Sequence, residues 1–384
     1  MMKTPFTAPR QMKRVFLKAL VLLIICDALQ MALGLTQALD HWSLYRYFTP
    51  PAARLGQALQ IGDPAWWRLD VLFDAHEIAQ PKAPDEYRVI FLGDSSTFCL
   101  YCSASEAIPQ AFTDLGLTID GKRVRGYNLA YPGPDWLKDL LILKHALNYQ
   151  PDAIVWLVTA KGSSDQPTPA QPEAHLFTRL NADELPDLQR RLGFQVWEMA
   201  QFADADEWYQ SSILAKGGRI RDWLILVARS LHRALIEPGK DMTRVYLPPG
   251  APVTQRPIRF PAEITSALPG YGTLPNSRWD LLLAGQRLAQ EAGVPLLLVN
   301  EPIYLASGLH SDVNYNSDYE RGVYDRFRVA MTSFTQEHGL TYLDLWNHLP
   351  PEEFSNTPLH YTAGGNRHIA EEMMAELQRL LSGK

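Results

Sequence analysis

The chain has 384 residues, of which 46% are hydrophobic and 20% are charged, and its net charge is −6 at pH 7. This composition is typical of a globular protein and excludes a disordered or fibrous chain. The acidic balance argues against nucleic-acid binding, which would need clustered Lys and Arg, so we expect no nucleic-acid partner.

A basic start and an apolar segment open the chain. Residues 1–14 contain no acidic residue and four basic ones: Lys3, Arg10, Lys13 and Arg14. Residues 15–39 are mostly apolar, with one acidic residue near the middle, Asp27. As a helix rising about 1.5 Å per residue, this segment is long enough to cross a hydrocarbon layer of roughly 30 Å. Because basic residues stay on the cytoplasmic side, we predict a single-pass signal anchor, with the basic tail 1–14 in the cytoplasm and the main domain outside it.

Two other interpretations of the apolar segment stay open. A cleaved signal peptide would need a small-residue cleavage site, and Ala32-Leu33-Gly34 supplies only a weak one. A soluble amphipathic helix is the other alternative. The signal peptide, like the anchor, places the main domain outside the cytoplasm.

Residues 40–84 are rich in Pro, Trp and Arg, and we interpret them as a juxtamembrane stalk. Beyond them, short apolar runs alternate with stretches whose apolar residues have helical spacing. The predicted strands are 88–92, 124–130, 153–158, 295–300 and 341–345. The predicted helices are 104–115, 135–148, 278–292, 318–338 and 363–381. This alternation predicts an α/β fold of three layers, α/β/α, around a five-stranded, mainly parallel sheet of flavodoxin-like type.

The alternation stops over residues 165–275, which hold many Pro and two helical stretches. We interpret this region as a helical insertion or lid. The sheet domain is therefore expected in two halves, 85–164 and 276–384.

Polar residues follow the predicted strands at the edge where α/β sheets place their functional groups. The first strand runs into Gly93, Asp94 and Ser95, and His360 comes shortly before the last helix. A Ser on a turn from strand to helix exposes its hydroxyl, and its backbone N–H favours negative charge. A His from another loop can take the hydroxyl proton, so the pattern indicates nucleophilic acyl transfer.

The motif FLGDSST at 91–97, together with a late His before a Gly-rich helix start, resembles the SGNH/GDSL hydrolase family. The resemblance covers roughly residues 86–163 and 276–384. It implies an esterase, lipase, carbohydrate deacetylase or acyl-transferring relative. It also implies that Ser95 is the nucleophile and His360 the general base. The backbone N–H groups of Ser95 and of Gly133, in NLAYPG, would hold the oxyanion.

Two positions depart from the family pattern. The third block of the family places an Asn after the third strand as an oxyanion donor, and here Ala160 stands there, beside Thr159. The family also has an Asp about three residues before the His, and here that position is Thr357, with Asn356 one residue earlier. An Asn can orient an imidazole, so we include Asn356 among the candidate catalytic residues.

Several further residues have supporting or structural roles to fill. We expect Asp94 to brace the nucleophile turn and Asn128 to hold the second loop, with Thr159 as a further supporting residue. Cys99 and Cys102 form a C-x-x-C that could be a small disulfide outside the cytoplasm or two buried thiols. No further zinc ligands accompany the pair and no nucleotide-binding motif occurs, so we expect no metal and no cofactor.

The sequence thus predicts a membrane-anchored, extracytoplasmic serine ester hydrolase or O-acyltransferase. Its expected substrate is an acylated glycan or another small ester, with acetyl as one candidate acyl group, in the cell envelope or on a lipid-linked molecule. The alternative is a catalytically inactive member of the fold that binds glycan or scaffolds an envelope complex. The substitutions at Ala160 and Thr357 motivate that alternative.

Overall fold

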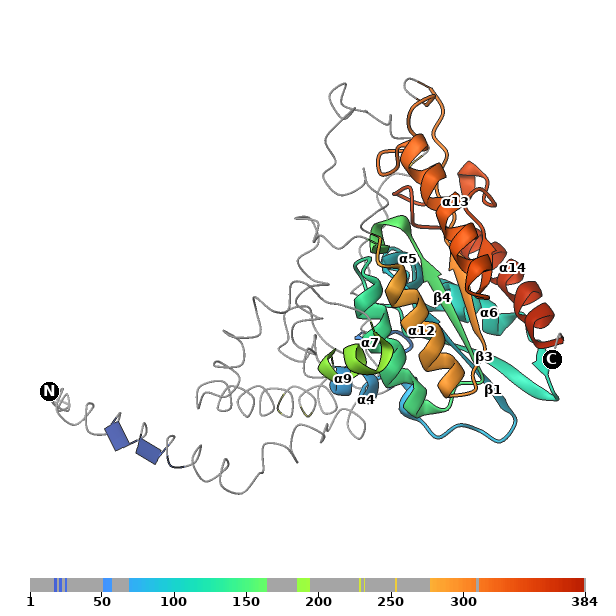
Figure 1. Ribbon diagram of the computed structural model, residues 1–384. Helices are drawn as coiled ribbons and strands as arrows, with labels where there is room; N and C mark the ends of the chain where they lie inside the picture. Colours follow the sequence, from blue (N-terminus) through green and yellow to red (C-terminus); the bar gives the residue numbers. More distant parts are fainter. Residues whose placement is uncertain are drawn as a thin grey trace, which may run out of the picture. The chain divides into compact units, whose positions relative to one another are not determined.

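The computed structural model describes residues 51–56, 69–163, 185–193, 277–308 and 311–382, and a few single positions elsewhere (Figure 1). Nearly all of these residues belong to one compact unit, residues 50–195 and 239–384. The predicted anchor and most of the predicted insertion lie outside the described residues. Among the helices that the structure describes, none combines the length and apolar character that a membrane span requires.

The centre of this unit is a six-stranded sheet with the order β2-β3-β1-β4-β5-β6. The strands are β1 (Glu86–Leu92), β2 (Thr118–Ile119), β3 (Lys122–Asn128), β4 (Ala153–Val158), β5 (Leu296–Asn300) and β6 (Thr341–Asp344). All neighbouring pairs are parallel except β2 and β3. The α/β class and the mainly parallel sheet are confirmed, and all five predicted strands are present.

The sixth strand, β2, is a correction to the predicted five. It forms a two-residue hairpin with β3, in which Ile119 pairs with Lys122. The turn between them is Asp120-Gly121, and both residues have a positive φ, 51° and 74°. Asp-Gly with two positive φ angles is the favoured connection of a tight hairpin. The strand is too short to give an apolar run, so only the turn sequence could have predicted it.

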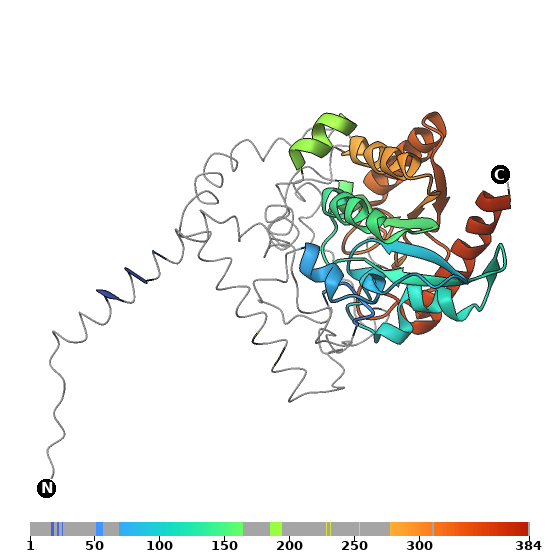
Figure 2. The same cartoon turned by 90° about the horizontal axis from the view of Figure 1, so that it is seen from below.

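Helices cover both faces of the sheet. They are α4 (Leu69–Asp74), α5 (Ser95–Phe98), α6 (Ile108–Asp114), α7 (Trp136–Ala146), α9 (Leu185–Leu192), α12 (Trp279–Glu291), α13 (Arg321–Glu337) and α14 (Ala363–Ser382). Short 3-10 helices include η2 (Glu77–Ala79), η3 (Ala104–Glu106), η4 (Leu147–Tyr149), η5 (Ala160–Ser163) and η10 (Pro351–Glu353). Helices α6 and α14 lie on one face, and α7 and α12 lie on the other (Figures 1 and 2).

Alternation along the buried strands explains why both faces are apolar. On β1, Val89 and Phe91 belong to a core cluster with side chains of α6 and α14. On β4, Trp156 points the other way, and a Cβ on Gly285 of α12 would lie 2.5 Å from its ring. Successive side chains of a strand point to opposite faces, so strands covered on both sides read as continuous apolar runs.

The described residues of the predicted stalk pack on the sheet unit. Leu55, Leu72 and Phe73 are fully buried. Single bridges connect Ala52 with His76, and Arg54 with Asn128. Within the predicted stalk, residues 51–56 and 69–84 are therefore part of the folded unit. The apolar side chains of this segment find a partner surface that its Pro- and Trp-rich composition did not indicate.

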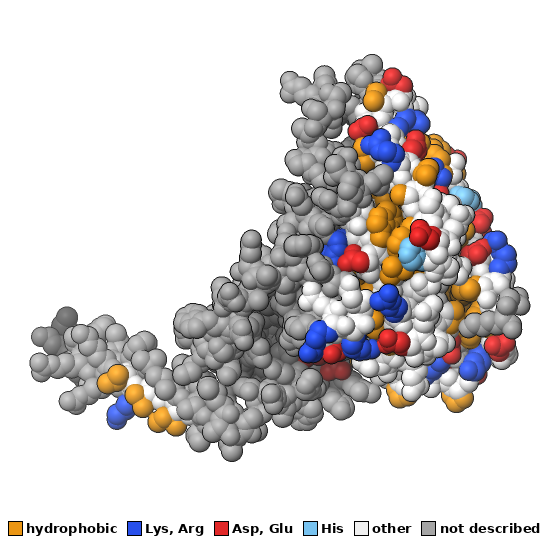
Figure 3. Space-filling model, viewed as in Figure 1, with side chains coloured by type: hydrophobic (Ala, Val, Ile, Leu, Met, Phe, Trp, Pro, Cys, Tyr) orange, Lys and Arg blue, Asp and Glu red, His pale blue; other side chains and the backbone are white. Residues whose placement is uncertain are grey.

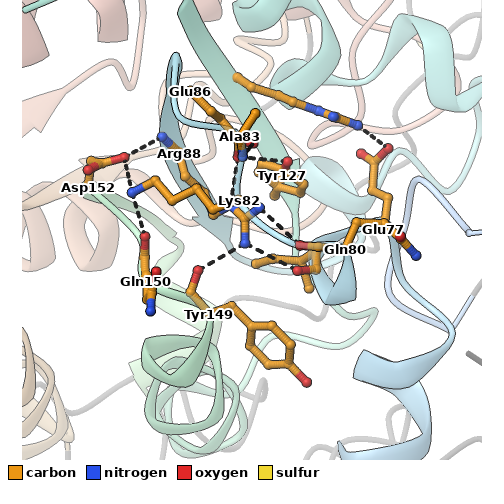
Figure 4. A network of polar contacts seen from close by, with 12 residues as sticks. Glu77, Gln80, Lys82, Ala83, Glu86, Arg88, Tyr127, Tyr149, Gln150 and Asp152 are labelled. Carbon is orange, nitrogen blue, oxygen red and sulfur yellow. Dashed lines mark hydrogen bonds and ion pairs between the residues drawn. The ribbon is translucent and has the colours of Figure 1, made fainter. Parts of the chain in front are cut away.

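A polar network closes the amino-terminal edge of the sheet (Figure 4). Arg88 is buried, and its Nε donates to Glu86 Oε1 at 2.7 Å. Its guanidinium also donates to three backbone carbonyls, those of Ile78, Gln80 and Tyr149. Tyr127 donates to the same Glu86 oxygen at 2.8 Å. A buried charge needs such compensation, and here it connects η2 and η4 to β1.

The exposed charges form no large field of one sign on the face seen in Figure 3. Acidic and basic side chains of the described residues are interspersed there. This pattern is typical of an ordinary solvated surface.

Candidate active site

The site lies where the chain reverses its direction across the sheet. From β1 the chain passes to β3 on one side, and β4 then pairs on the opposite side of β1. Because these strands are parallel, their carboxyl ends meet at one edge. In open α/β sheets, such a switch point forms a crevice that receives ligands. Ser95 follows β1 directly at this point.

A tight turn presents Ser95 at the first position of α5. Asp94 is the N-cap residue, and its Oδ1 accepts the backbone N–H of Ser96 at 2.9 Å. Gly93 allows the close approach behind the turn, since a Cβ there would lie 2.6 Å from Thr97 Oγ1. Ser95 itself is half-buried, so its hydroxyl stays within reach of a substrate.

His360 comes from the loop before α14 and meets Ser95 at the same edge. Its Nε2 lies 3.0 Å from Ser95 Oγ, although 265 residues separate the two in sequence. The ring of Tyr101 packs against the imidazole edge to face, with centroids 4.6 Å apart. This distance is the hydrogen-bond reach that a general base requires.

Thr357, and not Asn356, contacts the other nitrogen of His360. Thr357 Oγ1 forms a short hydrogen bond with Nδ1. Asn356 is buried in the same loop, and its Oδ1 accepts from Ser355 Oγ at 3.1 Å. When Nε2 accepts the Ser95 proton, Nδ1 must carry a hydrogen, so Nδ1 donates to Thr357. A hydroxyl can orient the imidazole in this way, but it adds no negative charge to stabilise an imidazolium.

The second loop carries Gly133, and a buried lysine holds it in place. Lys138 is fully buried, and its Nζ contacts three carbonyl oxygens: Tyr131 at 2.5 Å, Gly133 at 2.7 Å and Gly93 at 3.2 Å. It also pairs with Asp139 at 3.0 Å. Gly133 has a φ of 95°, a conformation that favours glycine. Lys138 thus connects the nucleophile turn with the Gly133 loop. The sequence analysis did not predict this role for Lys138.

Asn128 and Thr159 lie at the ends of β3 and β4, and both are buried. Asn128 Nδ2 donates to Thr97 O at 3.0 Å, and its Oδ1 accepts from the backbone N–H of Ala130 at 3.3 Å. It therefore connects α5 with the loop after β3. Ala160 begins η5 and has no side-chain donor. The next residue, Lys161, pairs with Asp318 at 3.0 Å.

Glu301 is a second residue that sequence reasoning missed. It directly follows β5, is 1% exposed, and lies behind the nucleophile turn. Its Oε2 lies 2.5 Å from Ser96 Oγ. Functional groups tend to follow parallel strands, and Glu301 follows the fourth predicted strand, 295–300. Its position after that strand is the signal that could have identified it.

Cys99 and Cys102 are paired as a disulfide, with their Cα atoms 5.2 Å apart. Cys99 is the C-cap residue of α5, with a φ of 66°. Tyr101 lies between the two cysteines, so this short segment connects α5 to the aromatic ring that packs on His360. Among the described residues, no group of three or more His, Cys, Asp or Glu is arranged to hold a metal ion.

Burial decides the protonation state of His360. The half-buried imidazolium loses hydration, which lowers the pKa of His360 from 6.5 to about 4. The charges of Asp94 and Asp318 act in the opposite direction, and Lys161 lowers the pKa further. The imidazole is therefore neutral at physiological pH, the form in which it accepts a proton.

We therefore expect activity to persist in mild acid. A base must be unprotonated, so kcat/KM for an aryl acetate should fall only as the pH drops through about 4. The pH profile of product formation, measured by chromatography, checks this. Asp318→Asn should move the acid limb to lower pH, because it removes a negative charge that raises the pKa. An acid limb near pH 6.5, the ordinary pKa of histidine, in the wild type would contradict the expectation.

Comparison with known proteins adds a distant likeness. No protein-family model matches the chain, and no curated protein matches it either. Among solved structures, the chain is similar to a protein named as an acylhydrolase from Bacteroides fragilis, with 11% identity and a TM-score of 0.36. It is also similar to a GDSL-like lipase from Bacteroides thetaiotaomicron, with 10% identity and the same TM-score. Each match covers 79% of this chain and 92% of the other.

These likenesses are too distant to carry a functional argument. The class that this chain's own fold and site define is an α/β sheet protein with a Ser–His pair at its switch point. Two of the residues that the SGNH/GDSL resemblance singles out, Ser95 and His360, lie within hydrogen-bond distance of each other.

Proposed function

We propose that this protein is a serine ester hydrolase of SGNH type, with Ser95 as the nucleophile and His360 as the general base. The 3.0 Å contact between Ser95 Oγ and His360 Nε2 carries the proposal. Two residues on unrelated loops reach hydrogen-bond distance at the switch point of the sheet. A serine beside an oriented imidazole can act as the nucleophile in acyl transfer, with the imidazole as its base.

The first half of the reaction forms an acyl-enzyme. His360 Nε2 takes the proton of Ser95 as Oγ attacks the ester carbonyl, while Nδ1–H donates to Thr357. The negative charge that develops on the carbonyl oxygen is stabilised by the backbone N–H groups of Ser95 and Gly133. The tetrahedral intermediate then collapses, and His360 returns the proton to the departing alkoxide.

The second half regenerates the enzyme. Water, or a sugar hydroxyl in the transferase version, loses a proton to His360 and attacks the acyl carbonyl. Collapse of this intermediate releases the acid or the new ester, and Ser95 recovers its proton. The missing third-block side chain at Ala160 leaves the oxyanion two backbone donors, so we expect turnover to be slow relative to a three-donor site.

The substrate class and location are further parts of the proposal. The basic tail 1–14 and the apolar segment 15–39 support a membrane-attached protein whose catalytic domain lies outside the cytoplasm. An ester of an envelope glycan or of a lipid-linked molecule is then the substrate that such a domain would meet. An acetyl group is one candidate for the acyl group.

A fluorophosphonate probe tests the reaction type. Such probes phosphonylate an activated serine, whose oxygen displaces fluoride from phosphorus, so we expect a covalent adduct that mass spectrometry locates at Ser95. Preincubation with an aryl acetate substrate should slow the labelling. An intact, folded protein that forms no adduct and turns over no aryl acetate would support the non-catalytic alternative, a glycan-binding or scaffolding role.

A further inference from the structure

Glu301 is a buried carboxyl group in contact with the nucleophile turn. Its Oε2 lies 2.5 Å from Ser96 Oγ, and its Oε1 accepts from Thr97 Oγ1 at 3.2 Å. The hydroxyl of Tyr361 lies 3.3 Å from Oε2. These three neighbours are buried as well, so each described side chain of the cluster is shielded from solvent. The mechanism above assigns the cluster no role.

The hydrogen bonds of this cluster cannot all form if both carboxyl groups, Asp94 and Glu301, are ionised. Ser96 Oγ has one hydrogen, yet it contacts two carboxyl oxygens, Asp94 Oδ1 at 2.9 Å and Glu301 Oε2 at 2.5 Å. The hydrogen of Tyr361 has a nearer acceptor in Pro302 O, at 2.9 Å. With both carboxylates ionised, two bare oxygens would face each other at one of the Ser96 contacts. A proton on one carboxyl group removes this repulsion.

The surroundings place that proton on Glu301. Asp94 Oδ1 accepts the backbone N–H of Ser96 at 2.9 Å, so this oxygen already acts as an acceptor. Glu301 has no cation and no backbone N–H as a partner among the described residues. Burial raises the pKa of Glu301 well above its ordinary value, and the charge of Asp94 raises it further. The other titratable groups near it, Tyr361 and Tyr324, are neutral, because burial raises the pKa of each.

We propose that Glu301 is a positioning residue that acts in its protonated form. Its O–H donates to Ser96 Oγ, which in turn donates to Asp94 Oδ1. This chain of hydrogen bonds connects the end of β5 to the N-cap of α5 and holds the turn that presents Ser95. Ionisation of Glu301 would turn the hydrogen of Ser96 away from Asp94 and release the turn. The catalytic consequence rests on the proposed function, whereas the protonation state does not.

The pH dependence of stability tests the protonation state without any substrate. If Glu301 is protonated in the folded protein, unfolding releases its proton at any pH above the ordinary pKa of 4.5. Stability is then lost as the pH rises from that value toward the raised pKa. Glu301→Gln keeps the donor and cannot ionise, so its Tm relative to the wild type should rise by about 3 °C per pH unit in that window.

The exposed Glu337→Gln is the matched control, and its Tm difference from the wild type should stay constant with pH. A Glu301→Gln difference that is flat or falls with pH would mean that Glu301 is ionised in the folded protein. That result would overturn the proposal, whether or not the protein is an esterase.

Ester turnover tests the positioning role. Glu301→Gln should remain within a fewfold of the wild type and should lose the alkaline limb of the pH profile. Glu301→Leu removes the donor and should lower kcat/KM by about 10²-fold at pH values below the alkaline limb, as expected when a nucleophile is misplaced by roughly 1 Å. Equal losses in both variants would contradict the positioning role. A wild type with no turnover would instead count against the proposed function and leave the stability test to decide on Glu301.

Discussion

Ser95→Ala should lower kcat/KM for an aryl acetate by about 10⁴- to 10⁶-fold. The substitution removes the only atom that forms the acyl-enzyme bond and leaves the oxyanion donors, which account for the residual rate. Ser95 is half-buried and its Oγ points toward His360 Nε2 at 3.0 Å, so alanine loses one hydrogen bond and little packing. The folded structure should therefore survive, and near-ultraviolet circular dichroism and Tm would confirm this.

Two companion variants make the Ser95 result interpretable. Ser105→Ala changes an exposed serine ten residues later in the chain and should keep wild-type turnover. His360→Ala should cost about as much as Ser95→Ala. The double variant should cost little more than either one, because residues that act as a unit have non-additive effects. If Ser95→Ala retains more than a tenth of the wild-type rate, the nucleophile assignment is wrong.

Lys138→Met should destabilise the protein by about 3–5 kcal/mol and lower kcat by about 10²-fold. Methionine has a similar length, but it cannot donate to the carbonyls of Gly93, Tyr131 and Gly133 that Lys138 now brings together. Without this shared donor, the nucleophile turn and the Gly133 loop lose their connection, and the oxyanion donors move apart. Chemical denaturation gives the stability change, and turnover under native conditions gives the kinetic one.

Asp139→Asn separates the positioning effect from simple destabilisation. Burial raises the pKa of Asp139 to about 7, while Lys138 and Trp156 oppose that shift, so the carboxyl group is already partly neutral at physiological pH. The asparagine oxygen can accept from Trp156 Nε1, which now donates to Asp139 at 3.0 Å, or from Lys138 Nζ, but not from both. We expect a smaller loss of stability than in Lys138→Met, and a kcat near that of the wild type. Equal kinetic losses in the two variants would show that Lys138 acts through stability alone.

The sheet could be predicted closely because apolar runs that are buried on both faces have a strong signal. Strand β4 was predicted with its observed bounds, Ala153–Val158, and the other four predicted strands differ from the observed ones by at most two residues at each end. The predicted helix over 104–115 is in fact η3 followed by α6, separated at Ala107. The apolar spacing carries no sign of that break, and helix boundaries depend on local capping.

The candidate site was predicted only in part, because some of its residues lie in sequence motifs and others are brought to the site only by the fold. Ser95, Gly133 and His360 sit in motifs that follow strands or precede a helix, so their positions could be read along the chain. Lys138 lies within an amphipathic helix pattern, where a lysine normally indicates an exposed face. Its burial depends on carbonyls from two other loops that happen to converge on it. Thr357 likewise became a partner of His360 only because the loop folds back on itself.

The sequence by itself determined the class of the fold and the order of its elements, because hydrophobic periodicity and turn chemistry act over a few residues. Its resemblance to the SGNH/GDSL family pointed to Ser95 and His360. Tertiary structure alone decided the hydrogen-bond partners of those residues: Thr357 on His360, Lys138 under the Gly133 loop, and Glu301 behind the nucleophile turn. It also decided which carboxyl group keeps its proton. Burial and opposing charges are properties of the assembled site, since they arise from residues that are brought together across hundreds of positions.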